Sequence, residues 1–214
     1  AVGAPPAWGR SNHDVWRPVT RFAPWLDAGT IDVEAGRRRS LAMSLLSLAL
    51  PGSAYVYQGE ELGLEEVDVA PEDRQDPSWF RTGQPGRDGC RVPIPWSGSA
   101  PPFGFGPGTG QPWIPQPDAW KTLTVQAQQD DPDSTLSFYR RALAARRSLP
   151  ADEVSSVAAD GDVLTVRRGA LSVVVNCGSS PIPLPAGELL LASGPLDGAP
   201  AGHLPADTAV WVHA

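Results

Sequence analysis

The chain has 214 residues, of which 41% are hydrophobic and 19% charged, as expected for a soluble globular protein with a buried core. Its formal net charge of −7 argues against binding to nucleic acid or to an anionic membrane surface. No apolar run reaches the roughly 18 residues that a membrane-spanning helix needs. The sequence begins at Ala1 with neither an initiator Met nor a signal peptide, so we expect a fragment of a longer protein whose own N-terminus would carry the evidence on secretion. The expected location is cytoplasmic.

The first 36 residues predict little regular structure. Residues 1–15 are expected to form a loop that enters a short strand, and this strand ends in the polar cluster SNHD at residues 11–14. Residues 16–36 are expected to be loop or broken helix, because they contain the helix-breaking residues Pro18, Pro24, Gly29 and Gly36.

A buried helix and a buried strand are predicted next. Residues 37–50 place leucines at helical spacing and add apolar side chains nearly all round the helix. Pro51-Gly52 ends this helix, and the apolar residues 54–57 indicate a short strand buried on both faces. Helix, tight turn and buried strand form the repeating unit of a parallel α/β sheet or barrel.

A long segment, residues 63–132, shows no sustained periodicity. A connection of this length inside a compact domain is expected to be functional or to fold on itself. Many of the 24 prolines and 22 glycines fall between residues 83 and 118, with aromatic residues among them. The aromatic residues favour an ordered loop over a flexible one.

An amphipathic helix is predicted at residues 134–149, capped by Asp133 or Ser134 and ended by Pro150. Its four arginines, at positions 140, 141, 146 and 147, are expected to form a solvated face.

Beyond Pro150 the apolar pattern changes to a period of two, which indicates short strands in a small antiparallel sandwich. The predicted strands are residues 163–168, 170–177, 184–193 and 208–213. We therefore expect two domains, residues 1–149 and residues 150–214.

The polar cluster at residues 11–14 follows the first predicted strand, which is where a parallel barrel places its active site. On these four residues alone, a loop that uses Asn12 and Asp14 to form turns is the alternative. Two further motifs, YVYQGEELG at residues 55–63 and GRDGCRVPIPW at residues 86–96, bear on the choice.

Together with SNHDVWRPVTRF at residues 11–22, these motifs resemble, in order and spacing, three segments of the α-glucosidases of glycoside hydrolase family 13, the α-amylase family. The resemblance covers nearly the whole chain. It implies an α/β fold, the C-terminal part of a (β/α)8 TIM barrel with its last two strands, followed by a small antiparallel β-sandwich domain.

The resemblance also implies roles for three residues. Asp14 matches the third carboxylate of the family, which holds sugar hydroxyls and stabilises an oxocarbenium-like transition state. His13 is expected to hydrogen-bond the same sugar, with a structural imidazole as the alternative. Arg87 matches an arginine near the non-reducing end of the substrate in exo-acting members, where a guanidinium would bind sugar hydroxyls or brace an acidic partner.

Other charged residues are expected to support the scaffold. The resemblance places the motif of Glu60 and Glu61 at the barrel rim, and adjacent glutamates on a strand would point to opposite faces. Asp88 and Arg91 are expected to form local ion pairs. Arg10 stands where relatives have an aliphatic residue, and a buried unpaired arginine there would be costly.

The expected function is that of an exo-acting retaining α-glucosidase, whose partner is a small α-glucoside substrate. A retaining glycosidase needs a nucleophile and a general acid/base, which in this family lie on earlier barrel strands. The chain is therefore expected to be inactive alone and to need the N-terminal half of the barrel. Trehalose synthases and other enzymes that transfer or isomerise glucosyl units are alternatives, as are non-catalytic amylase-like binding subunits.

No cofactor or metal is expected. No glycine-rich phosphate loop follows a strand. Cys90 and Cys177 are 87 positions apart and show neither metal-ligand nor disulfide-framework spacing.

Overall fold

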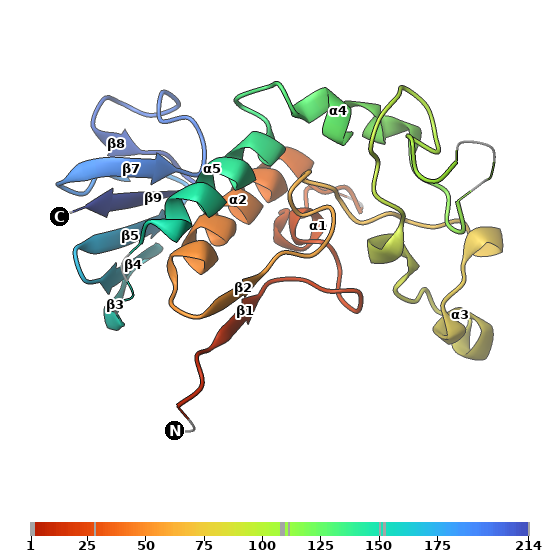
Figure 1. Cartoon of the computed structure of the whole chain (residues 1–214), viewed down its shortest axis with the longest axis horizontal. Coiled ribbons are helices and arrows are strands. Elements are labelled where there is room, and N and C mark those ends of the chain that lie inside the picture. Colours follow the sequence, from red (N-terminus) through yellow and green to blue (C-terminus); the bar gives the residue numbers. More distant parts are fainter. Residues whose placement is uncertain are drawn as a thin grey trace. The chain divides into compact units, whose positions relative to one another are not determined.

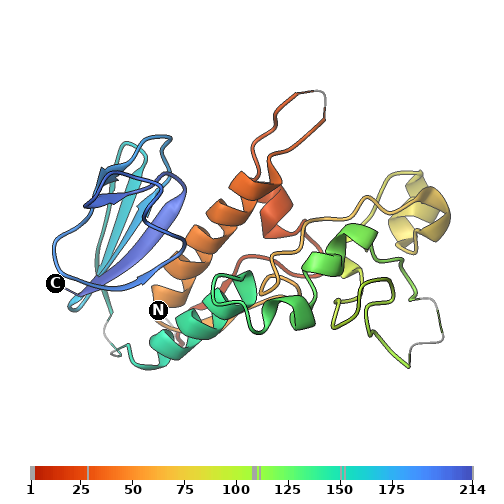
Figure 2. The same cartoon turned by 90° about the horizontal axis from the view of Figure 1, so that it is seen from above.

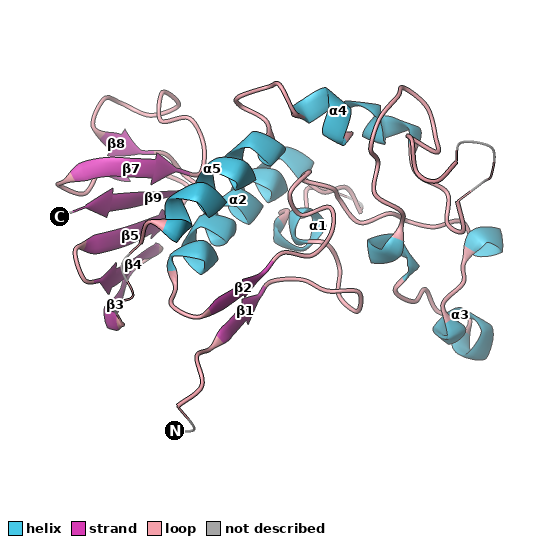
Figure 3. Ribbon diagram, in the orientation of Figure 1, coloured by secondary structure: helices cyan, strands magenta, loops and turns pink. Residues whose placement is uncertain are grey.

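The computed structural model describes residues 3–27, 29–107, 110, 112–149, 151 and 153–213. The chain divides into two compact units, each built from separated stretches of sequence. Unit 1 comprises Ala1–Gly9, Phe22–Tyr55 and Arg140–Ala214, and unit 2 comprises Arg10–Arg21 and Val56–Tyr139. The long helix α2 and the strands belong to unit 1, whereas unit 2 is mostly loop with short helices (Figure 1 and Figure 3).

Two short parallel strands lie in unit 1. β1 (Ala7–Gly9) pairs with β2 (Ser53–Tyr55) in register. The turn before β2 requires glycine at position 52, because φ is +98° and a Cβ there would lie 2.2 Å from the carbonyl oxygen of Pro6. The prediction of a strand buried on both faces is wrong, since β2 ends at Tyr55 and this side chain is 65% exposed. A strand is buried on both faces only when other elements pack over each face. Within the described residues β2 belongs to a two-stranded sheet and pairs with β1 alone.

The helix α2 (Val33–Ala49) is the predicted leucine-rich helix, and Leu45 and Leu48 are buried in it. It begins before the predicted start at residue 37, because the side chain of Asp32 accepts a hydrogen bond from the Ala35 amide at 2.9 Å and caps the first turn. Gly36, which was expected to lie in a loop or a broken helix, is therefore a buried residue of a regular helix.

Two arginines bind the carbonyl groups at the C-terminal end of α2. Arg146 of α5 (Thr135–Arg147) donates to the Leu50 carbonyl at 2.9 Å, and Arg168 donates to the Ala49 carbonyl at 2.9 Å. Both cations lie at the negative end of the helix dipole, where they are favoured. The prediction that Arg146 belongs to a solvated face is thus wrong, because these carbonyl groups have no partner inside the helix and bind its guanidinium.

A five-stranded antiparallel sheet follows, with the spatial order β3-β4-β5-β9-β7. Its strands are β3 (Val154–Asp160), β4 (Val163–Arg168), β5 (Leu171–Asn176), β7 (Glu188–Ala192) and β9 (Thr208–His213). One face packs against α2 (Figure 2), and the indole of Trp211 donates to the Leu45 carbonyl at 3.0 Å. The other face packs against the ribbon of β6 (Ile182–Pro183) and β8 (His203–Leu204).

The four predicted strands correspond to β4, β5, β7 and β9; the bounds of β4 and β9 are as predicted, whereas β5 and β7 are shorter than predicted. β3 was missed because its residues are small or polar and mostly exposed, so they show no alternation of apolar side chains. The predicted boundary between residues 1–149 and 150–214 stays a prediction, and Pro150 lies outside the described residues.

Unit 2 contains the segment that was predicted to be an ordered loop. The helices α3 (Pro77–Thr82) and α4 (Val125–Gln128) lie wholly in it. It also contains the first four residues of α1 (Pro18–Phe22) and the start of α5, up to Tyr139. Its 3-10 turns are Pro71–Asp73, Asp88–Arg91 and Asp118–Thr122. The predicted cap at Ser134 is confirmed, since its hydroxyl accepts a hydrogen bond from the Ser137 amide at 3.2 Å.

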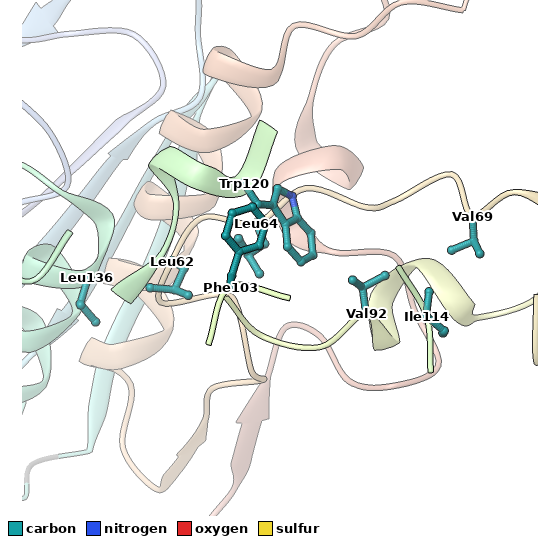
Figure 4. Packing of buried hydrophobic residues seen from close by; sticks show 8 residues of the cluster. All are labelled: Leu62, Leu64, Val69, Val92, Phe103, Ile114, Trp120 and Leu136. Atoms are coloured by element: carbon teal, nitrogen blue, oxygen red, sulfur yellow. The ribbon is translucent and has the colours of Figure 1, made fainter. Parts of the chain in front are cut away.

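A hydrophobic core holds these loops together. It consists of Leu62, Leu64, Val69, Val92, Phe103, Ile114, Trp120 and Leu136 (Figure 4). The aromatic residues that predicted an ordered loop divide into two groups, because Phe103 and Trp120 are buried whereas Phe80 and Trp113 are exposed. Among the described residues, no helix is long and apolar enough to cross a membrane.

Candidate active site

Asp14 lies in a turn that follows β1 in the chain. Its amide donates to the side-chain oxygen of Asn12 at 2.8 Å, so Asn12 forms the turn that its residue type predicts. The Asp14 side chain is 48% exposed. The turn therefore presents a carboxylate to solvent and fixes its backbone.

Two arginines hold the Asp14 carboxylate. Arg87 Nη1 donates to Asp14 Oδ1 at 2.8 Å, and Arg91 Nη2 donates to the same oxygen at 3.1 Å. The hydrogen bond from Arg87 is the main cause that lowers the pKa of Asp14 below its ordinary value. The carboxylate is thus ionised at neutral pH.

The structure brings together the three residues singled out from the sequence. His13 Nε2 lies 3.5 Å from Asp14 Oδ2, and the carbonyl of His13 accepts a hydrogen bond from Arg91 Nε at 2.8 Å. Arg87 braces Asp14, which is one of the two roles considered for its guanidinium.

A second carboxylate, Asp76, holds the same two arginines from the other side. Arg87 Nε donates to Asp76 Oδ2 at 2.6 Å, and Arg91 Nη1 lies 3.6 Å from this oxygen. The Asp76 side chain is only 1% exposed. The hydrogen bond from Arg87 lowers the pKa of Asp76, and the two carboxylates together raise the pKa of Arg87. We call Asp14, Asp76, Arg87 and Arg91 the ion cluster.

No pattern in the sequence singled out Asp76, and Arg91 was expected to form only a local ion pair. Asp76 precedes Pro77 and its side chain accepts a hydrogen bond from the Ser78 amide at 2.8 Å, so the available signal was that of a helix cap. Asp88 forms no ion pair with Arg91 and instead accepts hydrogen bonds from the amides of Gln75 and Asp76, each at 3.0 Å.

Arg10 and Glu60 form a second polar group in unit 2. Glu60 is buried and accepts hydrogen bonds from Arg10, from the Ser11 hydroxyl at 2.6 Å and from the Tyr139 hydroxyl at 3.2 Å. Arg10 is therefore paired, and the cost of an unpaired arginine does not arise. Glu60 and Glu61 lie in a turn after β2 rather than on a strand, so the argument from opposite strand faces does not apply to them.

Arg17 connects the turn of Asp14 to the two other motifs. Its buried guanidinium donates to the carbonyls of Gln58 at 2.7 Å and Cys90 at 3.0 Å. Its Cζ lies 5.8 Å from the ring centroids of both Tyr57 and Trp120, which is within the range of a cation–π contact. The three sequence motifs thus meet at one side chain.

Burial also changes the acidity of groups near Arg17. Desolvation raises the pKa of Glu61 and of Glu66, and it raises the pKa of the Cys90 thiol to about 11. The thiol therefore stays protonated at neutral pH. Cys90 and Cys177 are both free.

Comparison with known proteins places this arrangement in a family. The family model described as alpha amylase, catalytic domain, matches residues 6–152, which include all three motifs. The chain belongs to the α-amylase family. A probable α-glucosidase of Rhizobium meliloti strain 1021 is 41% identical over 175 residues, covering 79% of this chain and 30% of the relative. An oligo-1,6-glucosidase of Parageobacillus thermoglucosidasius is 28% identical over 161 residues, covering 64% and 26%.

Solved structures of the α-amylase family have the same fold over 97% of the chain. An α-glucosyl transfer enzyme superposes with a TM-score of 0.76 at 34% identity, and the match covers 40% of that enzyme. A trehalose-6-phosphate hydrolase of Bacillus licheniformis superposes with a TM-score of 0.78 at 22% identity and shares the fold. The predicted fold class, the C-terminal part of a (β/α)8 barrel followed by a small antiparallel β domain, is confirmed. The chain spans between a quarter and a third of the length of these curated relatives, 30% and 26%.

Proposed function

We propose that this chain is the C-terminal part of an exo-acting retaining α-glucosidase that removes terminal α-linked glucose from short α-glucosides. The observation that supports this best is the Asp14 carboxylate, which is ionised, half exposed and held by two arginines in the turn after β1. Barrel enzymes place their reacting groups after the C-terminal ends of strands. The similarity to a probable α-glucosidase supports the same substrate class.

Asp14 would act mainly in the transition state. As the glycosidic bond breaks, positive charge develops at the anomeric carbon and the sugar hydroxyls become more acidic. A fixed carboxylate that accepts hydrogen bonds from these hydroxyls therefore binds the transition state more strongly than the substrate. Arg87 and Arg91 keep this carboxylate ionised and in place.

His13 and Arg87 would contact the same glucose unit. The imidazole of His13 lies beside the carboxylate of Asp14 and is largely exposed, so it can reach a hydroxyl that Asp14 binds. The Arg87 guanidinium is partly exposed and pairs with Asp14. The Asp14 carboxylate can therefore accept one hydrogen bond from Arg87 and another from a sugar hydroxyl that lies beside this guanidinium.

The remaining two reacting groups would come from the rest of the enzyme. The nucleophile and the general acid/base are expected on earlier barrel strands, and the exposed Tyr55 of β2 is where neighbouring strands of the complete barrel would pack. We therefore propose that this chain needs the N-terminal barrel half for activity. A cytoplasmic location is part of the same proposal.

Hydrolysis of p-nitrophenyl α-D-glucoside tests the proposed function. The full-length enzyme is expected to release p-nitrophenol, and the purified 214-residue chain is expected to release none. Formation of glucosylated acceptor when a second sugar is added would indicate a glucosyl-transferring enzyme instead, like the solved α-glucosyl transfer enzyme. Release of p-nitrophenol by the 214-residue chain alone would contradict the proposal.

A further inference from the structure

A buried carboxylate outside the three sequence motifs, that of Asp76, binds the arginine that holds Asp14. We propose that Asp76 is a positioning residue, which fixes the Arg87 guanidinium so that its outer nitrogen holds Asp14 for the reaction. Asp76 does not contact the substrate and acts mainly through Arg87, because Arg87 Nε donates to it at 2.6 Å whereas Arg91 Nη1 lies 3.6 Å away. The inference rests on the proposed function, because it assigns Asp76 to the site of Asp14.

The Arg87 guanidinium lies between two carboxylates that differ in exposure. Its Nε donates to Asp76, which is 1% exposed, and its Nη1 donates to Asp14, which is 48% exposed. The contact to Asp76 is also the shorter of the two, at 2.6 Å against 2.8 Å. A substrate can compete for the exposed carboxylate but not for the buried one, so Arg87 keeps its orientation when Asp14 engages a sugar.

Asp76 is itself fixed on every side. Its Oδ1 accepts from the Ser78 amide at 2.8 Å, its Oδ2 accepts from the Arg87 amide at 3.1 Å, and its own amide donates to Asp88 at 3.0 Å. Gly86 leaves it no free space, since a Cβ at position 86 would lie 2.5 Å from both Cβ and Cγ of Asp76. A buried charge with all these contacts has one orientation, and it imposes that orientation on Arg87.

A double-mutant cycle in the full-length enzyme tests whether Asp76 acts through Arg87. Asp76→Asn keeps an oxygen that can cap α3 but removes the charge that holds Arg87. We expect it to lower kcat/KM roughly tenfold to a hundredfold in the wild-type background, the usual cost of losing a group that orients a reacting residue. In the Arg87→Ala background the same change is expected to lower kcat/KM by a much smaller factor, because the main residue that Asp76 positions is gone and only the longer contact to Arg91 remains.

A purely structural role for Asp76 gives a different pattern. Its replacement would then lower kcat/KM by the same factor in both backgrounds, and this additive result would overturn the proposal. Glu72→Gln is the matched control, since it removes one exposed carboxylate from the same segment and is expected to leave kcat/KM unchanged in both backgrounds.

Gly86→Ala provides a second arm if Asp76→Asn does not fold. Its added methyl group displaces the Asp76 side chain without removing any polar group, and the same dependence on Arg87 is expected. The proposed function is judged separately. If Asp14→Asn lowers kcat/KM at least a hundredfold but both cycles are additive, only the role of Asp76 falls. If the wild-type enzyme does not act on α-glucosides, both proposals fall.

Discussion

Replacing Asp14 with asparagine is expected to lower kcat/KM of the full-length enzyme on p-nitrophenyl α-D-glucoside roughly a hundredfold to a thousandfold, the usual cost of removing one fixed electrostatic contact to a transition state. Asparagine has nearly the same shape, so the change isolates the charge. The variant loses the negative group that binds increasingly acidic hydroxyls, while Arg87 and Arg91 stay in place beside Asp76. Initial rates over a range of substrate concentrations measure the effect.

Asp68→Asn is the control for this substitution. Asp68 makes an ion pair with Arg74 at 3.4 Å, but its side chain is 96% exposed and it is not a member of the ion cluster. We expect its replacement to change kcat/KM less than about twofold, as is usual for an exposed ion pair. An Asp14→Asn enzyme as active as the Asp68→Asn enzyme would contradict the role given to Asp14.

Replacing Arg17 with alanine is expected to cost about 3–5 kcal/mol of folding stability, because removing a buried charged donor leaves its acceptors without partners. The carbonyls of Gln58 and Cys90 lose this donor, and the contacts of the guanidinium with the rings of Tyr57 and Trp120 are lost. Thermal unfolding of the full-length enzyme, followed by tryptophan fluorescence, is expected to show a midpoint lower by several degrees. Burial lowers the pKa of the Arg17 guanidinium, because desolvation disfavours its charged form. The hydrogen bonds to the carbonyls and the contacts with the rings offset this cost.

Arg81→Ala provides the comparison for Arg17. Arg81 is an exposed arginine of α3 whose Nε donates to the Pro77 carbonyl at 3.2 Å. Its replacement is expected to change stability by less than about 0.5 kcal/mol. Equal midpoints for the two variants would show that Arg17 does not hold the three motifs together.

Local patterns in the sequence were sufficient for much of the fold. The leucine spacing of α2 and the short apolar runs of β4, β5 and β9 predicted the right elements, because these segments are largely buried: β5 is buried along its whole length and β9 up to its last residue. The start of α2 was misplaced because Gly36 was taken as a breaker, whereas the cap at Asp32 and burial of this turn outweigh a single glycine.

The candidate site was predictable only in part. Asp14, His13 and Arg87 were found through sequence motifs, and the structure brings them together. Asp76 was not found, because the three-dimensional path of the loop brings it against Arg87 and no regular spacing in the sequence indicates this contact. The same holds for Arg17, whose acceptors are backbone carbonyls more than 40 positions away in the chain.

A crystal structure of the full-length enzyme with a glucose-shaped iminosugar inhibitor tests the role of Asp14 most directly. At least one Asp14 carboxylate oxygen is expected to lie at about 2.5–3.0 Å from a hydroxyl of the bound ring, the ordinary range for such a hydrogen bond. Arg87 is expected to keep its contact with Asp76 in the complex. An inhibitor seated in the active site with Asp14 out of hydrogen-bond reach of every hydroxyl would contradict the account.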